Sequence, residues 1–234
     1  MPIAETIKTG EVPNDQTQAD LHTLFREIRA SHVSNLNSLH GRGMVLFSEG
    51  ETARGVFIMR TGRATVSITS SEGRVVILRT ATSGDVLGLN AVLGGSAYDT
   101  TVKTLKPCRT DFIARPHLLD LLENPAGARA ILTLLSQELT ALTDRARLLL
   151  LPQTASARLA KLLLDWSGED GLNTSSAPRI DKVFTHEEIS QMICSSRETV
   201  TRLLASMSRR RIIHINSESI LIRDRAALEA MGVS

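Results

Sequence analysis

The strongest constraint on the fold is a regular spacing of apolar residues that follows Pro125. From Ala128 onward, apolar residues recur at alternating intervals of four and three, at Leu132, Leu135, Leu139, Leu142, Ala146 and Leu149. A heptad pattern of about three repeats predicts a long helix whose apolar stripe meets a second copy of itself.

This helix carries further apolar residues outside the stripe. Ile131, Leu134 and Ala141 predict a second face that packs on the chain's own core. A helix that packs only on that core is the alternative interpretation. Pro152 interrupts the pattern, so we expect a hinge near residues 151–153, because proline removes a backbone hydrogen bond from a helix interior.

The sequence before the helix has the pattern of short β-strands. Between Gly43 and about Arg115, runs such as 56–59, 64–68 and 75–78 are rich in β-forming residues and are separated by glycines. Regular turns of this kind predict an antiparallel roll or barrel.

The N-terminal region has the features of neither a signal peptide nor a membrane span. Residues 1–20 are polar and predict a flexible tail. The apolar residues that follow have the spacing of a short amphipathic helix: Leu21, Leu24, Phe25 and Ile28. Because no apolar run approaches the roughly 20 residues that cross a bilayer, we expect a cytoplasmic protein without membrane contact.

Residue types with metal or catalytic chemistry are few and scattered. The six histidines lie outside the predicted strands of the roll, whereas a metal enzyme built on a roll needs histidines and a glutamate on adjacent strands. The two cysteines, Cys108 and Cys194, lack the spacing of a metal site. We therefore expect neither an enzyme nor a metal site.

The C-terminal part predicts two short helices separated by a turn. Thr185-His-Glu-Glu188 fits a capping box at the start of the first helix. After a turn at residues 194–196, a second helix has its apolar residues on one face and Glu198, Thr201 and Arg202 on the other. The pair is typical of a helix-turn-helix.

Positive charge gathers around this helix pair, although the net charge of the whole chain is only +2. The segment from Ser196 to Ile215 contains one acidic residue and five arginines, which are Arg197, Arg202, Arg209, Arg210 and Arg211. The apolar runs 212–215 and 220–222 predict a hairpin, or wing, after the second helix. A basic winged helix-turn-helix predicts a surface that faces DNA phosphates.

Three side chains near the start of the second helix have the chemistry to read bases. An arginine presents two parallel N–H groups to guanine, and a carboxylate accepts from cytosine N4, so Arg197, Glu198 and Arg202 suit a G·C-containing site. In the alternative interpretation, Glu198 closes a capping box with Ser195 or pairs with Arg202 on a solvated face.

The run from Phe184 to Leu204, FTHEEISQMICSSRETVTRLL, resembles the helix-turn-helix of the Crp/Fnr family of bacterial transcription regulators. The predicted roll, heptad helix and hinge occur in that family's order, so the resemblance covers nearly the whole chain after residue 20. It implies that Arg197, Glu198 and Arg202 read a TGTGA-like half-site. A glycine is common in the family where this chain has Cys194, and the role of that thiol is left open.

The resemblance implies an α+β fold in four segments. These are a flexible tail (1–20), a sensor β-roll (21–118), a dimerisation helix with a hinge (119–152), and a winged helix-turn-helix domain (153–234). It also implies a homodimer that binds an inverted repeat of double-stranded DNA and works with RNA polymerase, as activator or as repressor. Phosphate contacts are expected from Thr185, Ser196 and Thr199, and from the basic Arg209 and Arg210.

The expected sensor departs from the family's cyclic-nucleotide site. Gly84-Asp-Val-Leu-Gly88 resembles its phosphate-binding cassette. The cassette's sugar-binding Glu is replaced by Leu89, and its phosphate-binding Arg falls at Tyr98 or Asp99. Thr143 matches a family threonine that contacts adenine. Because an acid repels a phosphate, cyclic AMP is not the expected effector.

Other cofactors of the family also lack their ligands. The clustered N-terminal cysteines of the iron–sulfur branch are absent, and the roll segment that supplies a haem ligand has no Cys or His. The pocket either holds another small molecule or is vestigial, and a nucleotide relay acting on a protein is a further alternative. The candidate pocket comprises Leu87, Gly88, Leu89, Tyr98, Asp99, Thr100 and Thr143.

Overall fold

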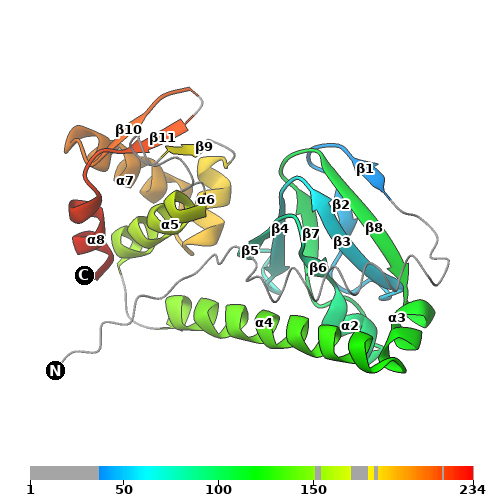
Figure 1. The fold of residues 1–234 in the computed structure, drawn as a ribbon. Helices are drawn as coiled ribbons and strands as arrows, with labels where there is room; N and C mark the ends of the chain where they lie inside the picture. The colour runs from blue at the N-terminus through cyan, green and yellow to red at the C-terminus, as the bar shows by residue number, and fades with distance from the viewer. Residues whose placement is uncertain (1–36, 151–153, 170–178, 182–183, 218, 234) are drawn as a thin grey trace. The chain divides into compact units, whose positions relative to one another are not determined.

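The computed structural model describes residues 37–150, 154–169, 179–181, 184–217 and 219–233 (Figure 1). The predicted tail, the N-terminal amphipathic helix and the hinge at 151–153 lie outside the described residues. The chain divides into two compact units, and the division lies within one long helix, between Leu142 and Thr143.

The first unit contains the predicted β-roll, built from two antiparallel four-stranded sheets (Figure 1). One sheet has the order β1 (Ser38–His40), β8 (Cys108–Ala114), β3 (Gly55–Thr61) and β6 (Val86–Leu87). The other has the order β2 (Val45–Phe47), β7 (Thr101–Thr104), β4 (Ala64–Thr69) and β5 (Val75–Ala81). The three runs of β-forming residues thus lie in β3, β4 and β5.

Two short helices, α2 (Leu89–Gly94) and α3 (Arg115–Leu122), complete the core of the roll. Ile58, Ile113 and Leu118 are fully buried there. The turn between β3 and β4 requires glycine, because Gly62 has a φ of 99° and a Cβ would lie 2.5 Å from the Pro107 carbonyl oxygen.

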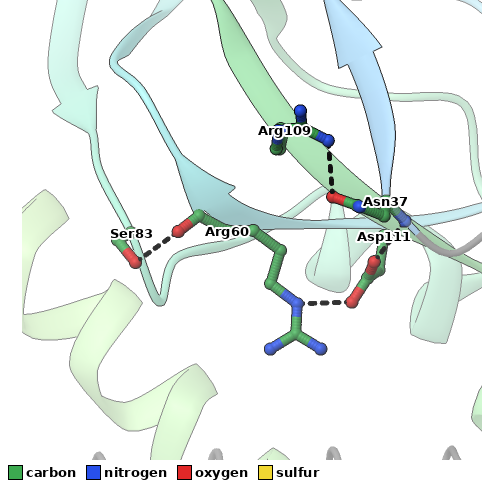
Figure 2. Close-up of polar contacts among 5 residues, drawn as sticks. All are labelled: Asn37, Arg60, Ser83, Arg109 and Asp111. Carbon is green, nitrogen blue, oxygen red and sulfur yellow. Dashed lines mark hydrogen bonds and ion pairs between the residues drawn. The ribbon is translucent and has the colours of Figure 1, made fainter.

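A buried carboxylate ties the start of β1 to the sheet (Figure 2). Asp111 is 2% exposed and accepts hydrogen bonds from Arg60 Nε at 2.5 Å and from the Asn37 amide at 2.6 Å. Arg109 donates to the Asn37 side chain at 3.3 Å, and Ser83 donates to the Arg60 carbonyl at 2.7 Å. Because a buried charge without its partner costs about 3–5 kcal/mol, this cluster fixes where the chain enters the roll.

The long helix α4 (Pro125–Leu150) follows the predicted pattern with one exception. Ala130 and Ile131 are buried, and Leu134 and Leu135 are partly buried against the core of the roll. Ala141 is exposed, contrary to the prediction, because burial along this face fades after Glu138.

The heptad stripe of α4 remains largely uncovered within one chain. Leu132, Leu139 and Leu142 are 66%, 67% and 43% exposed, and Ala146 is exposed as well. Leu135 belongs partly to the side that faces the roll, and the side chain of Leu149 lies outside the described residues.

The second unit contains a helix pair and a three-stranded antiparallel sheet of order β10-β11-β9 (Figure 1). Its elements are α5 (Ala155–Glu169), β9 (Arg179–Asp181), α6 (His186–Met192), α7 (Arg197–Arg209), β10 (Ile213–Ile215), β11 (Ser219–Ile222) and α8 (Arg225–Val233). The predicted wing is the hairpin β10–β11. The sequence did not indicate β9, which pairs with β11.

The predicted position of the histidines outside the roll strands was wrong for His40, which ends β1, because that strand is only three residues long and has a weak sequence signal. His214 lies in β10, within the predicted wing. Among the described residues, no three His, Cys, Asp or Glu side chains gather where they would hold a metal ion. Over the same described residues, no helix has the length and apolar character needed to cross a bilayer.

Candidate DNA-binding site

A capping box fixes the start of α6, as predicted. The Thr185 hydroxyl accepts from the Glu188 amide at 3.2 Å, and the Glu188 carboxylate accepts from the Thr185 amide at 2.7 Å. Two backbone donors that the helix leaves unpaired are satisfied in this way. Further along α6, Ile189 and Met192 are buried.

The turn between the two helices contains a backbone conformation that favours glycine. Cys194 has a φ of 49°, which costs a residue with a side chain about 1 kcal/mol relative to glycine. This explains why glycine is common at the matching position of the family. The Cys194 thiol is free and half-buried.

Ser196 caps the second helix, α7, by accepting from the Thr199 amide at 3.2 Å. The alternative cap, formed by Ser195 and Glu198, was therefore wrong. Ser195 instead donates its amide to the Ser190 carbonyl at 3.0 Å and closes the turn.

The two faces of α7 differ as the sequence predicts. Val200, Leu204 and Met207 are buried. The candidate base-reading residues Arg197, Glu198 and Arg202 are exposed. Of the candidate phosphate contacts, Thr199 is half-buried, and four are exposed: Thr185, Ser196, Arg209 and Arg210.

The Glu198 carboxylate is held in its charged form by groups at the helix start. The pKa of Glu198 is lowered by a hydrogen bond from its own backbone amide, by the Ser196 hydroxyl, and by nearby Arg197. The predicted alternative, an ion pair with Arg202, does not form in the described part of the chain. Both side chains are exposed on the outer face of α7, and the Glu198 carboxylate also contacts the helix start.

A histidine that the sequence did not single out joins the two helices. The Thr201 hydroxyl donates its proton to the Arg197 carbonyl at 3.0 Å, so it accepts from Nδ1 of His186 at 2.9 Å. This bond connects the first turn of α6 with the middle of α7. In the sequence, the signal for this contact was that His186 directly follows the capping threonine, Thr185.

Several candidate pocket residues of the roll are buried, and a side chain occupies the space beside Gly88. Leu87 and Leu89 are each 2% exposed within the core. The Tyr98 ring stacks on Phe47 with centroids 3.9 Å apart, and its hydroxyl donates to the Gly55 carbonyl at 2.5 Å. Gly88, at a φ of 81°, leaves room for that ring, since a Cβ would lie 2.6 Å from it.

Acidic groups lie near the candidate pocket residue Asp99. Asp99 accepts from the Asn90 side chain at 3.1 Å, and Asp85 pairs with Arg79 at 3.2 Å. Burial raises the pKa of Glu138 on α4; Arg79 partly offsets this rise, while Asp99 and Asp85 add to it. These groups therefore form a predominantly negative environment.

The other two candidate pocket residues differ in exposure. Thr100 is half-buried beside β7, and Thr143 is exposed at the start of the second unit. A separate cavity of about 370 Å³ has a largely aromatic wall and shares Tyr98 with the candidate pocket. It is lined by Leu46, Phe47, Glu51, Thr52, Arg54, Phe57, Tyr98 and Phe112.

Known families match both units of the chain. A Crp-like helix-turn-helix domain matches residues 157–231, and a cyclic nucleotide-binding domain matches residues 40–125. A "CRP-like cAMP-activated global transcriptional regulator" of Mycobacterium tuberculosis is 26% identical over 188 residues, covering 80% of this chain and 84% of that protein. A "Global nitrogen regulator" of Synechococcus elongatus is 25% identical and covers 89% of this chain and 95% of that protein.

Solved structures of regulators share the fold. FixK2 from Bradyrhizobium japonicum has a TM-score of 0.73 at 22% identity, covering 85% of this chain and 97% of that one. A CRP-family regulator from Thermus thermophilus has a TM-score of 0.71 at 23% identity, covering 84% and 97%. The two matched domains and the relatives point to the same family. These findings show that the chain belongs to the Crp/Fnr family of transcription regulators.

Proposed function

We propose that this regulator binds an inverted-repeat DNA operator as a homodimer and reads its bases with α7. The observation that carries the proposal is the exposed polar face of α7, where Arg197, Glu198 and Arg202 lie near the start of the helix. In the described part of the chain, no hydrogen bond or ion pair engages the Arg202 side chain. Its forked donors are therefore available for a guanine, and the ionised Glu198 is available for a cytosine.

We assign phosphate contacts to the residues that flank this face. Ser196 and Thr199 lie at the N-terminus of α7, where backbone amides and the helix dipole favour an anion. Thr185 caps the neighbouring helix and is exposed. Arg209 and Arg210, at the other end of α7, add positive charge that attracts any DNA sequence.

The exposed stripe of α4 supports the homodimer. Leu132, Leu139 and Leu142 form an apolar surface that one chain leaves in water. Pairing with the same stripe of a second copy buries these leucines at a, d spacing. The resulting symmetry places two α7 helices on two half-sites, about one turn of DNA apart.

The roll is proposed not to respond to cyclic AMP, unlike the relative from Mycobacterium tuberculosis, whose name describes it as cAMP-activated. A cyclic nucleotide needs room for a sugar and a cation for its phosphate. Here Leu89 is buried, the Tyr98 ring fills the space beside Gly88, and carboxylates prevail around Arg79. The residues present do not fit this ligand.

The wider functional assignment follows the domain order. We assign sensing to residues 21–118, dimerisation and hinge motion to 119–152, and DNA binding to 153–234. Such a regulator acts in the cytoplasm, on the chromosome, and controls transcription through RNA polymerase.

Fluorescence anisotropy on labelled duplexes tests the proposal. At physiological salt, an inverted repeat of TGTGA-like half-sites is expected to bind roughly 10³-fold or more tightly than a scrambled duplex of equal composition. Equal affinity for the two duplexes would contradict it.

A further inference from the structure

Two arginines hold the carbonyl end of α6, the first helix of the DNA-binding pair. Arg158 of α5 donates from Nε to the Ile193 carbonyl at 2.7 Å and from Nη2 to the Cys194 carbonyl at 3.5 Å. Arg145 of α4 donates from Nη2 to the Met192 carbonyl. The last carbonyls of a helix lack intrahelical partners and carry partial negative charge, so guanidinium donors stabilise them.

The two arginines come from different parts of the chain. Arg158 lies on α5, inside the DNA-binding domain. Arg145 lies near the end of α4, the helix whose stripe is the proposed dimer seam, and it is partly buried. By contrast Arg147, two positions further, is exposed and pairs with Asp144 at 3.1 Å on the helix surface. At this helix end, Arg145 thus contacts the DNA-binding helix pair, whereas Arg147 is exposed to solvent.

A fixed end of α6 also fixes α7. The turn from Ile193 to Ser196 is short, and the bond between Ser195 and Ser190 closes it onto α6. The contact between His186 and Thr201 joins the two helices a second time. A group that holds Met192 therefore holds the recognition helix through two connections.

We infer that Arg145 is a positioning residue that sets the recognition helix relative to the dimerisation helix, and through it the spacing between the two half-sites that the dimer accepts. This inference rests on the proposed function. In a two-fold dimer, the separation of the two α7 helices depends on how each is attached to the shared seam. The bond from Arg145 to Met192 is such an attachment, and it does not pass through residues 151–153.

The experiment measures how strictly the full-length dimer requires one half-site spacing. Anisotropy titrations compare the preferred inverted repeat with duplexes that have one base pair more or fewer between the half-sites. One base pair rotates a half-site by about 35° and shifts it by roughly 3.4 Å. The wild-type protein is expected to bind the altered duplexes much more weakly.

Arg145→Ala is expected to reduce this spacing discrimination by about tenfold, the effect of one charge-assisted hydrogen bond, with the preferred half-site sequence unchanged. Arg147→Ala, which removes the same charge from the same helix end, is expected to keep the wild-type discrimination. Arg158→Ala is expected to lower the melting temperature but also to keep the discrimination, because that arginine lies within the DNA-binding domain.

Wild-type spacing discrimination in a folded, dimeric Arg145→Ala would overturn the inference. Light scattering and a melting curve establish the dimer and the fold of each variant. If alanine prevents folding, Arg145→Lys gives the same comparison, since lysine keeps the charge but lacks the forked donor geometry. A wild-type protein that does not prefer the inverted repeat to a scrambled duplex contradicts the proposed function instead.

Discussion

The recognition helix and the sensor roll belong to one family architecture but differ in how they retain its chemistry. On α7, the three polar side chains that match the family's base-reading residues are present and exposed. In the roll, the positions that the resemblance matches to nucleotide contacts hold Leu89 and either Tyr98 or Asp99. Leu89 and Tyr98 are 2% and 5% exposed. We propose that the fold is kept in both regions, whereas the binding chemistry is kept only on α7.

The contrast has a physical basis. A binding side chain must stay polar and accessible, and this is compatible with stability on the outer face of a capped helix such as α7. Inside the roll, an unused polar pocket loses stability, because buried polar groups without partners are costly. Leu89 and the stacked Tyr98 instead belong to the hydrophobic core of the roll.

The largest effect is expected from breaking the seam that makes two recognition helices act together. Leu132→Glu with Leu139→Glu places charge on two leucines of α4 that are 66% and 67% exposed. Monomers then bind one half-site at a time, so operator affinity should fall by roughly 100-fold or more. Light scattering and anisotropy measure both results.

A matched control for the seam variant is Leu122→Glu. Leu122 is also an exposed leucine, at 40%, but it lies on α3 and outside the stripe. It should leave the dimer intact. A seam variant that stays dimeric would show that α4 packs on its own roll alone.

The next largest effect is expected from two arginine variants of the DNA-binding domain. Their comparison distinguishes base reading from attraction to DNA phosphates. Arg202→Ala is expected to lose about 1–3 kcal/mol per half-site and to relax the preference at one G·C pair. Arg210→Ala should weaken binding to all sequences alike and reduce the salt dependence. If the two variants show the same profile across a set of single-substitution operators, Arg202 does not read bases.

Glu198→Ala tests whether the carboxylate reads a base or serves the helix start. Base reading predicts a changed preference at one position, whatever the change in melting temperature. Because the pKa of Glu198 is lowered, the carboxylate stays charged, and the preference should persist as pH falls until the lowered pKa is reached. A lower melting temperature with the same preferred sequence would assign Glu198 to the helix start.

The helix-start comparison uses Ser196→Ala. Its hydroxyl accepts from the Thr199 amide, so its loss should cost about 1 kcal/mol of unfolding free energy. Thermal melts of the two variants side by side distinguish a lost cap from a lost base contact.

A smaller effect is expected on the sensor side from Glu138→Gln. The pKa of Glu138 is raised by burial, so its charged form destabilises the fold as pH rises through that pKa. Glutamine removes this penalty and should raise the melting temperature by a few degrees near pH 7.5, with little change near pH 4. An equal shift at both pH values would show that the pKa of Glu138 is not raised in the folded protein.

Local patterns made much of this architecture predictable from the sequence. The heptad stripe predicted α4, the capping box at Thr185 predicted α6, and the apolar runs after it predicted the wing. Each signal lies within a few neighbouring residues, where periodicity and capping chemistry act directly.

Contacts between distant residues were not predictable in this way. Asp111 meets Asn37, 74 positions earlier, and Arg145 meets Met192, 47 positions later. Single polar residues have no period, so their partners become evident only when the fold brings them together. Ala141 shows the same limit, because its exposure depends on where the roll ceases to cover α4.

Selection from random duplex DNA, performed with and without cyclic AMP, tests the central claim most directly. The claim is that α7 retains its sequence-reading chemistry while the roll has lost its nucleotide site. We predict enrichment of an inverted repeat with TGTGA-like half-sites about one helical turn apart, equally with and without the nucleotide. Failure to enrich any inverted repeat, or enrichment that requires cyclic AMP, would contradict the account.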